Sequence, residues 1–374
     1  MLIWRPYNQT RRLDAPRIRR RLVILLAATS LALVGLDCSA DAGVERREET
    51  TGGPSSNAES DRLVRLSREQ PLMGTTFRIT VLAPDQIRGS RAIDAAFSEI
   101  ERVEHLISGW ESTSELSAVN RAAGEKPVRV GPELMELVET SLRLSAKTEG
   151  AFDITFAGCG SLWSFRKPDI PSPSALAACR GKIGFERIEL DTDDSTVFLP
   201  ESDMEIGVGG IGKGYGVDRA AETLEKQGVT NYIVDGGGDV RVRADDRERP
   251  WRVGVAHPRQ RGRLLGQLAV REGAVVSSGD YERYFERDGK RYHHILDPKT
   301  ARPARKAVAV TVLSDRTAAA DALSTGLFVM GPEEGLELAE RMPDVEAMII
   351  DPELEVHATE GFESRFQTQP RALP

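Results

Sequence analysis

The middle of the chain alternates between the hydrophobic periods of strands and helices. Residues 75–83, "TTFRITVLA", alternate apolar and polar side chains and are rich in β-branched residues, which is typical of a half-buried strand. Residues 90–108 and 131–150 carry apolar side chains at helical spacing, and Gly150 closes the second run. The pattern therefore predicts a strand followed by two amphipathic helices.

The alternation continues beyond residue 200. The same periods predict helices over 214–228, 318–331 and 333–342. They predict strands at 232–235, 251–256, around 272–279, around 290–297, at 307–314 and at 347–351. The strands around 272–279 and 290–297 are interpreted as hairpin-like. Because βα units mix with hairpins, we expect an α/β (α+β) fold, a single layered domain over residues 66–362 with a mixed, partly antiparallel sheet and a tail at 363–374.

The first forty residues have a different character. Seven arginines stand among the first 21 residues against the single Asp14, and an apolar run follows at 22–36, ahead of Cys38. A basic segment, a short apolar segment and small residues indicate an export signal over residues 1–40. The alternative is a retained membrane anchor, although a spanning helix needs roughly 20 apolar residues.

The cysteines leave two questions open. Cys38 stands where a lipoprotein signal places its lipidated cysteine, but Asp37 is unusual in that pattern, so both lipidated and unlipidated forms remain. Residues 41–65 lack apolar periodicity and are interpreted as a flexible tether. Cys159 and Cys179 are either a disulfide or two separate buried thiols.

The charge of the chain bears on its partners. The net charge is −8, and removing residues 1–21 takes away seven arginines and one aspartate, which leaves −14. An acidic body argues against nucleic acid as a partner.

The glycine-rich stretch "GVGGIGKG" at 207–214 fits two phosphate-loop patterns. A triphosphate loop needs Ser or Thr after the lysine to hold Mg²⁺, and Gly214 stands there instead. A dinucleotide loop fits better, since Asp235 ends the next predicted strand, but this pattern alone is a weak signal. A tight turn that packs a helix on a sheet is the alternative.

The stretch "ADALST" suggests a metal site. Asp321, Ser324 and Thr325 stand at i, i+3 and i+4, on one face of a helical turn. Three hard oxygen ligands suit Mg²⁺. The alternative is an exposed aspartate with two hydroxyls that bond back to helix carbonyls.

Eight motifs occur in order and carry a family resemblance. They are "PLMGTTF" at 71–77, "ESTSELSAVN" after Trp110, "GAFDIT" at 150–155, "GGIGKGYGVD" at 209–218, "VDGGGDVR" at 234–241, "SSGDYERYF" at 277–285, "HHILDP" at 293–298 and "ADALST" at 320–325. Together they resemble the ApbE family, the FAD:protein FMN transferases. The resemblance covers nearly everything after the tether and implies an ApbE/T-fold-like domain.

The resemblance also implies a set of site residues. The expected FAD contacts are Met73, Trp110, Ala151, Phe152, Asp153, Gly207, Lys213 and Ile295. The expected metal ligands are the Gly210 carbonyl, Asp321, Ser324 and Thr325. Relatives usually have aspartate where this chain has Gly207, and Glu205 is a candidate to compensate.

The implied reaction is the Mg²⁺-dependent transfer of FMN from FAD to a Thr or Ser hydroxyl of an acceptor flavoprotein, with release of AMP. His294 is the expected general base, and Asp321 could share that role. The alternatives are an FAD pyrophosphatase that yields FMN and AMP, and a non-catalytic FAD-binding lipoprotein. We expect the protein in the periplasm or on the periplasmic face of the inner membrane, held there if Cys38 is lipidated, with envelope electron-transfer subunits as acceptors.

Overall fold

The computed structural model describes residues 3–6, 63–165 and 168–368. Most of the predicted export signal, Cys38 and nearly all of the predicted tether lie outside the described residues. Within the described part of the chain, no helix is both long and apolar enough to cross a membrane.

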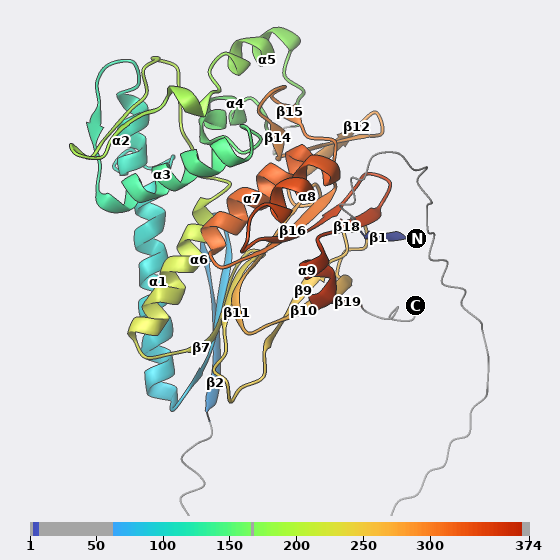
Figure 1. The fold of residues 1–374 in the computed structure, drawn as a ribbon. Coiled ribbons are helices and arrows are strands. Elements are labelled where there is room, and N and C mark those ends of the chain that lie inside the picture. Colours follow the sequence, from blue (N-terminus) through green and yellow to red (C-terminus); the bar gives the residue numbers. More distant parts are fainter. Residues whose placement is uncertain (1–2, 7–62, 166–167, 369–374) are drawn as a thin grey trace, which may run out of the picture. The chain divides into compact units, whose positions relative to one another are not determined.

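A nine-stranded sheet forms the centre of the fold (Figure 1). From one edge to the other its strands are β1 (Ile3–Pro6), β18 (Glu355–Ala358), β17 (Glu346–Ile350), β16 (Ala309–Ser314), β11 (Glu272–Gly279), β8 (Asp239–Arg243), β7 (Asn231–Gly236), β3 (Thr75–Ala83) and β2 (Val64–Leu72). Neighbouring strands are antiparallel, except that β1 runs parallel to β18. The predicted mixed sheet is confirmed.

Helices cover one face of this sheet. They are α1 (Gln86–Ile107), α6 (Gly212–Lys226), α7 (Thr317–Met330) and α8 (Pro332–Glu340). Helix α1 packs on β2 and β3, α6 on β7 and β8, α7 on β11 and β16, and α8 on β17. Alternate residues of a strand point to the same face of the sheet. Phe77, Ile79 and Val81 of β3 accordingly face the helices and are all buried against α1 and α6.

The opposite face of the sheet is covered as well. A small sheet of β9 (Trp251–Ala256), β10 (Leu264–Val270) and β19 (Phe366–Thr368) lies there with α9 (Glu360–Arg365). On β11, Val275 joins the core on this side, while Val276 joins the core under the helices. The centre of the main sheet is therefore buried on both faces, which explains its nearly continuous apolar strands.

A lobe of short elements lies beyond one end of the sheet (Figure 1). It consists of α2 (Glu115–Arg121), α3 (Pro132–Lys147), α4 (Ala157–Gly160), α5 (Pro173–Arg180), β4 (Val128–Arg129), β5 (Glu189–Asp191), β6 (Thr196–Phe198) and the 3₁₀ turns η1 (Ile154–Phe156) and η2 (Phe185–Arg187). Two small hairpins complete the fold, β12 (Tyr284–Arg287) with β13 (Lys290–His293) and β14 (Leu296–Asp297) with β15 (Arg302–Pro303).

Some sequence expectations differ from the structure. The hairpin expected around residues 290–297 is confirmed for β13, which pairs with β12, whereas β11 is not part of a hairpin, because it pairs with the distant strands β8 and β16. The fold also continues past residue 362, since Phe366 at the start of β19 packs against Phe362. At the other end, β2 begins at Val64, inside the predicted tether, and β1 lies within the predicted export signal.

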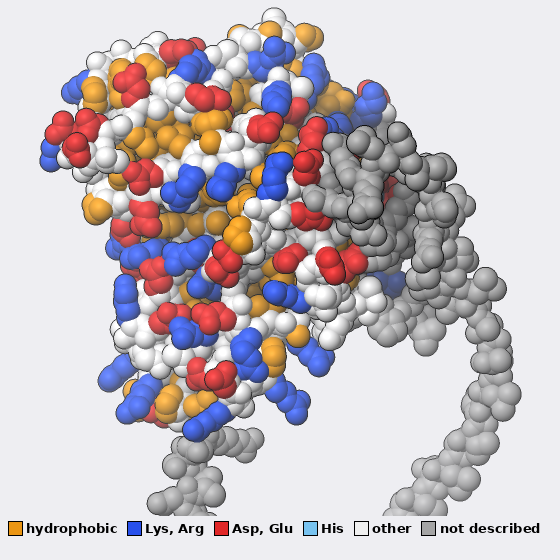
Figure 2. Space-filling view, in the orientation of Figure 1, with side chains coloured by type: hydrophobic (Ala, Val, Ile, Leu, Met, Phe, Trp, Pro, Cys, Tyr) orange, Lys and Arg blue, Asp and Glu red, His pale blue; other side chains and the backbone are white. Residues whose placement is uncertain are grey.

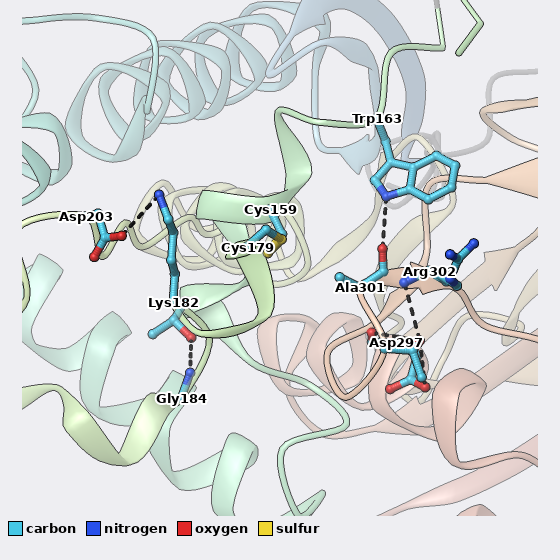
Figure 3. Close-up of a disulfide and its surroundings, with 11 residues drawn as sticks. Cys159, Trp163, Cys179, Lys182, Gly184, Asp203, Asp297, Ala301 and Arg302 are labelled. Atoms are coloured by element: carbon cyan, nitrogen blue, oxygen red, sulfur yellow. Dashed lines mark hydrogen bonds and ion pairs between the residues drawn. A yellow bond between two sulfur atoms is a disulfide. The ribbon is translucent and has the colours of Figure 1, made fainter. Parts of the chain in front are cut away.

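The structure decides between the alternatives for Cys159 and Cys179, which form a disulfide between α4 and α5 (Figure 3). Both half-cystines are buried in a small apolar cluster with Trp163. The Trp163 indole donates a hydrogen bond to the Ala301 carbonyl at 3.0 Å. The disulfide therefore joins two helices of the lobe, and the Trp163 hydrogen bond connects this cluster to the loop that follows β14.

Candidate functional site

The site begins where α6 crosses α7. A β-carbon at Gly214 would lie 2.4 Å from the Thr317 carbonyl oxygen, so only glycine permits this approach of the two helices. The same residue is the one that argues against a triphosphate loop. Its place in the chain is explained by helix packing.

A buried aspartate fixes the two helices relative to each other. Asp218 of α6 accepts hydrogen bonds from the backbone amides of Thr317 and Ala318, each at 3.0 Å. It thereby caps the first turn of α7 from a neighbouring helix. Arg241 and Arg316 lie 3.3 and 3.4 Å from its carboxylate and balance its charge. This cap places Asp321, one turn further along α7, beside the start of α6.

Lys213 holds two carboxylates together at this point. Its ammonium lies 2.8 Å from Asp239 Oδ2 and 3.2 Å from each carboxylate oxygen of Asp321. The Gly214 amide also donates to Asp321 Oδ2 at 3.2 Å. Both carboxylates are about 2% exposed, whereas the Lys213 side chain is 30% exposed. The lysine is thus the solvent-facing member of a buried acidic pair.

The charges of this triad influence one another. Burial raises the pKa of Asp239 well above its usual range, and the negative charge of Asp321 raises it further, while Lys213 opposes both effects. Burial alone would lower the pKa of Lys213, but Asp239 and Asp321 together raise it above its ordinary value. Lys213 is therefore a fixed positive charge at neutral pH.

Phe152, Gly210 and Thr325 meet next to the triad. A β-carbon at Gly210 would lie 3.3 Å from the Phe152 ring and 3.3 Å from the Thr325 hydroxyl oxygen. The glycine loop, the "AFD" segment and α7 therefore converge, as the resemblance implies. The Ser324 hydroxyl on the same turn is fully buried, donates to the Asp321 carbonyl at 2.9 Å and lies 2.8 Å from the Ser278 hydroxyl. Its predicted ligand role stays a prediction.

Two adjacent histidines stand at the end of β13, where His293 is its last residue. The His293 ring contacts the Ala304 carbonyl at 2.9 Å through Nε2 and packs edge-on against Phe328. The His294 Nδ1 atom is buried and has no hydrogen-bond partner among the described residues. Burial lowers the pKa of His294 to about 4, and the positive charges of His293, Arg283 and Lys213 contribute to the shift. His294 is consequently neutral at pH 7 and lies within the electrostatic reach of Lys213.

The side chain of Asp153 is occupied by the local turn. Its Oδ1 atom accepts from the Thr155 amide at 2.8 Å and from the Thr155 hydroxyl at 2.6 Å, and its Oδ2 atom accepts from the Phe185 amide at 3.1 Å. Burial raises its pKa despite these bonds. Asp153 therefore shapes the turn beside Phe152, and Ala151, which precedes them, is buried.

The remaining predicted FAD contacts differ in exposure. Met73 lies in the turn between β2 and β3 with a left-handed backbone (φ 51°), and its sulfur faces Gly216 of α6. Ile295 is buried in the main core. Trp110 is 98% exposed on the loop between α1 and α2. That loop leaves α1 beside the glycine loop, because Ile107 packs against Gly212.

Ala157 leaves no room for a side chain at Gly207. Its amide donates to the Ile154 carbonyl at 2.9 Å, and a β-carbon there would lie 2.8 Å from the Ala157 β-carbon. The segment 204–208 is not a strand, and Glu205 is exposed. Residues 205 and 207 would point to the same side if this described segment were a strand. Because it is not a strand, that argument for compensation by Glu205 does not apply.

Asp239 is the residue that sequence reasoning undervalued. It was not singled out as a site residue, yet it contacts Lys213 directly at 2.8 Å. The signal that could have found it is the aspartate directly after "GGG", where a strand begins beside a glycine-rich turn.

Comparisons with known proteins agree with this geometry. The ApbE family model matches residues 73–349. The FAD:protein FMN transferase of Vibrio cholerae serotype O1 is 36% identical over 279 residues, which is 72% of this chain and 83% of that protein. The FAD:protein FMN transferase of Treponema pallidum is 33% identical over 326 residues, 82% of this chain and 90% of that protein.

Solved structures show the same fold. The ApbE protein of Thermotoga maritima superposes with a TM-score of 0.75 at 29% identity, covering 81% of this chain and 100% of that one. The flavin transferase ApbE of Vibrio cholerae gives a TM-score of 0.72 at 31% identity, covering 81% and 99%. This chain therefore belongs to the ApbE family.

Proposed function

We propose that the protein transfers the FMN part of FAD to a threonine or serine hydroxyl of an acceptor flavoprotein and releases AMP, with Mg²⁺ bound. The observation that carries the proposal is the cluster of Lys213, Asp321 and the glycine-rich start of α6. The charge of Lys213 also contributes to the lowered pKa of His294. The relatives in Vibrio cholerae and Treponema pallidum are FAD:protein FMN transferases, which supports FAD as the substrate and a protein that carries FMN as the product.

The donor set fits a divalent cation. The carboxylate of Asp321 already holds a cation, the Lys213 ammonium, at both of its oxygens. The Thr325 hydroxyl lies on the next turn of the same helix and faces Gly210. Asp321, Thr325, the Gly210 carbonyl and Ser324 would hold Mg²⁺, which prefers a few hard oxygen ligands. Bound there, Mg²⁺ would supply positive charge to phosphate oxygens.

The start of α6 suits the diphosphate of FAD. Free backbone amides and the positive end of the helix dipole favour anions at a helix N-terminus. Lys213 in the first turn adds a full positive charge. Phe152 and Met73 would provide apolar walls for the rings of FAD, and Trp110 would stack on one of them.

His294 would act as the general base. The acceptor oxygen forms a bond to the FMN phosphorus, the bond from that phosphorus to the AMP oxygen breaks, and the hydroxyl proton passes to His294. Burial keeps the His294 imidazole neutral and able to accept this proton. The positive charge of Lys213 would stabilise the negative charge that develops on the phosphate oxygens.

Incubation with FAD, Mg²⁺ and a purified acceptor flavoprotein tests this function. AMP release and the mass of the acceptor are followed together, with a Thr→Val or Ser→Ala acceptor as the matched control. With the wild-type acceptor, we expect the amount of AMP released to equal the amount of FMN adduct formed. With the substituted control acceptor, we expect no adduct. AMP without adduct on any acceptor would identify a pyrophosphatase, and bound FAD without AMP would identify a storage protein.

We further propose that the protein is exported to the periplasm and acts on envelope flavoproteins. The disulfide between Cys159 and Cys179 supports this location, since disulfides persist in oxidising compartments. Inner-membrane anchoring would come from a lipid on Cys38. Protease accessibility in spheroplasts, compared between the native chain and Cys38→Ala, tests both points. A protein that stays protected in intact spheroplasts would refute export.

A further inference from the structure

The proposed reaction uses one of the two carboxylates that Lys213 holds, and the other has no role in it. Asp321 is assigned to the cation, whereas Asp239 is buried beside Asp321 and is not itself in the proposed ligand set. Asp239 is nevertheless the nearer partner of Lys213, at 2.8 Å against 3.2 Å. A buried carboxylate without a function of its own is costly to a fold, so its place requires an explanation.

The backbone holds Asp239 firmly in this position. It is the first residue of β8 and follows Gly237 and Gly238, whose φ angles of 70° and 99° favour glycine. A β-carbon at Gly237 would lie 2.2 Å from the Thr75 hydroxyl oxygen. The Asp235 carboxylate accepts a hydrogen bond from the Gly238 amide at 2.9 Å. These contacts fix the conformation of the turn and place Asp239 next to Lys213 at the start of α6.

The geometry contains a conflict between two cations. The Lys213 ammonium bonds both oxygens of Asp321. A divalent ion on the same carboxylate would repel that ammonium, and the repulsion is strong in a buried site. Lys213 must then give up Asp321, and Asp239 is its other carboxylate partner among the described residues.

We propose that Asp239 is a positioning residue that keeps the Lys213 ammonium in the site when a divalent cation takes Asp321, so that lysine and cation do not compete for one carboxylate. The inference rests on the metal site of the proposed function. It assigns the two carboxylates different cations, Asp239 to Lys213 and Asp321 to Mg²⁺.

Charge balance agrees with this division. With both carboxylates ionised, Lys213 and Mg²⁺ leave the group with one net positive charge, which suits a diphosphate substrate. Replacing Asp239 by asparagine removes the charge that holds Lys213 and leaves Asp321 as its remaining carboxylate partner. The ammonium then competes with Mg²⁺ more strongly.

Calorimetric titration of Mg²⁺ into the FAD-free protein tests the inference without measuring activity. We compare the wild type with Asp239→Asn, Lys213→Met and the double variant Asp239→Asn/Lys213→Met. Asp239→Asn should weaken Mg²⁺ binding on the order of tenfold, which corresponds to about 1.4 kcal/mol. Lys213→Met should bind Mg²⁺ at least as tightly as the wild type, and the double variant should regain wild-type affinity or better.

Asp280→Asn is the matched control for the loss of a buried negative charge. Asp280 is also buried, but its carboxylate pairs with Arg259 at 2.6 Å and Arg291 at 3.3 Å instead of with Lys213. Its replacement should leave the Mg²⁺ affinity unchanged. An equal loss in Asp280→Asn would mean that total charge, not the partner of Lys213, sets the affinity, and would overturn the inference.

The other outcomes are equally decisive. Unchanged affinity in Asp239→Asn, or weaker binding in Lys213→Met, would overturn the inference while the metal site of the proposed function stands. A double variant that stays weak would mean that Asp239 acts on the cation directly, which also contradicts it. Failure of the wild type to bind Mg²⁺, with or without FAD, would refute the metal site itself.

Discussion

Removing the disulfide between Cys159 and Cys179 should destabilise the protein by a predictable amount. The two half-cystines are separated by 20 residues. In the chain-entropy treatment, opening a loop of this length frees the unfolded state by about 3 kcal/mol at 25 °C. The variant is Cys159→Ala/Cys179→Ala, which removes the cross-link and keeps both positions apolar within the cluster around Trp163.

Urea and thermal unfolding measure the loss. For a folded region of roughly 300 residues, an unfolding entropy of about 2.1 cal/mol/K per residue converts 3 kcal/mol into a Tm decrease of about 5 °C. The control is the wild type in excess dithiothreitol, because reduction opens the same loop without deleting any sulfur. We expect the reduced wild type to match the variant, and the variant to be insensitive to reductant.

Loss of the disulfide should affect FAD binding less than it affects the stability of the fold. The disulfide shares a buried cluster with Trp163, whose hydrogen bond to Ala301 connects the lobe to the loop after β14, and Trp163 remains in the variant. FAD affinity should therefore change by less than the stability. A Tm decrease below about 1 °C, or a wild type whose stability ignores reductant, would refute the reasoning, because the loop would then be equally restricted with and without the cross-link.

Four further predictions concern residues of the site. In the wild type, kcat/KM should decrease on the acid side with an apparent pKa below 6.5, toward the His294 pKa of about 4. His294→Gln should abolish AMP release while FAD still binds. An apparent pKa at or above 6.5 would contradict the assignment of His294 as the base. The pKa of His294 in the folded protein lies below its unfolded value near 6.5, so the unfolded chain binds more protons between these two pH values. The free energy of unfolding in urea should therefore decrease as the pH drops through this window. The decrease should be smaller in His294→Gln. Gly207→Asp should cost about 1–3 kcal/mol through its clash with Ala157, and adding Ala157→Gly should restore the urea midpoint; equal stability of the two variants would show that the clash is not the cause. Trp110→Ala should leave Tm unchanged, because the side chain is 98% exposed, and should weaken FAD binding in a fluorescence titration about tenfold, since stacking on a base contributes about 1–3 kcal/mol; unchanged FAD affinity would exclude Trp110 from the binding site.

Local pattern predicted the elements better than their partners. The helical period places α1, α3, α6 and α7 close to their observed bounds, and Gly150 follows the end of α3 with φ 76° as a closing glycine does. The alternation in residues 272–279 predicts a strand, but both faces of β11 are buried between distant segments. Periodicity reports which side chains are buried and carries no information about which strand lies beside them.

The same limit applies to the site. The spacing of Asp321 and Thr325 is visible in the sequence because one helical turn carries both residues. The contact of Lys213 with Asp321 joins residues 108 positions apart, and it depends on the Asp218 cap and on the absence of a side chain at Gly214. Such contacts depend on how two helices cross, which no local pattern specifies.

One face of the surface carries charges of both signs. Acidic and basic side chains are intermingled over the face in Figure 2. The absence of nucleic acid from the partners stays a prediction.

The mass of the acceptor after one round of reaction tests the central claim most directly. Wild-type protein and His294→Gln are incubated in parallel with FAD, Mg²⁺ and the same acceptor flavoprotein, and the intact acceptor is weighed by mass spectrometry. The account predicts that the wild type adds the mass of FMN less one water to a single hydroxyl residue, and that His294→Gln leaves the acceptor unchanged. An acceptor that gains no mass while AMP accumulates, or equal labelling by both proteins, would contradict it.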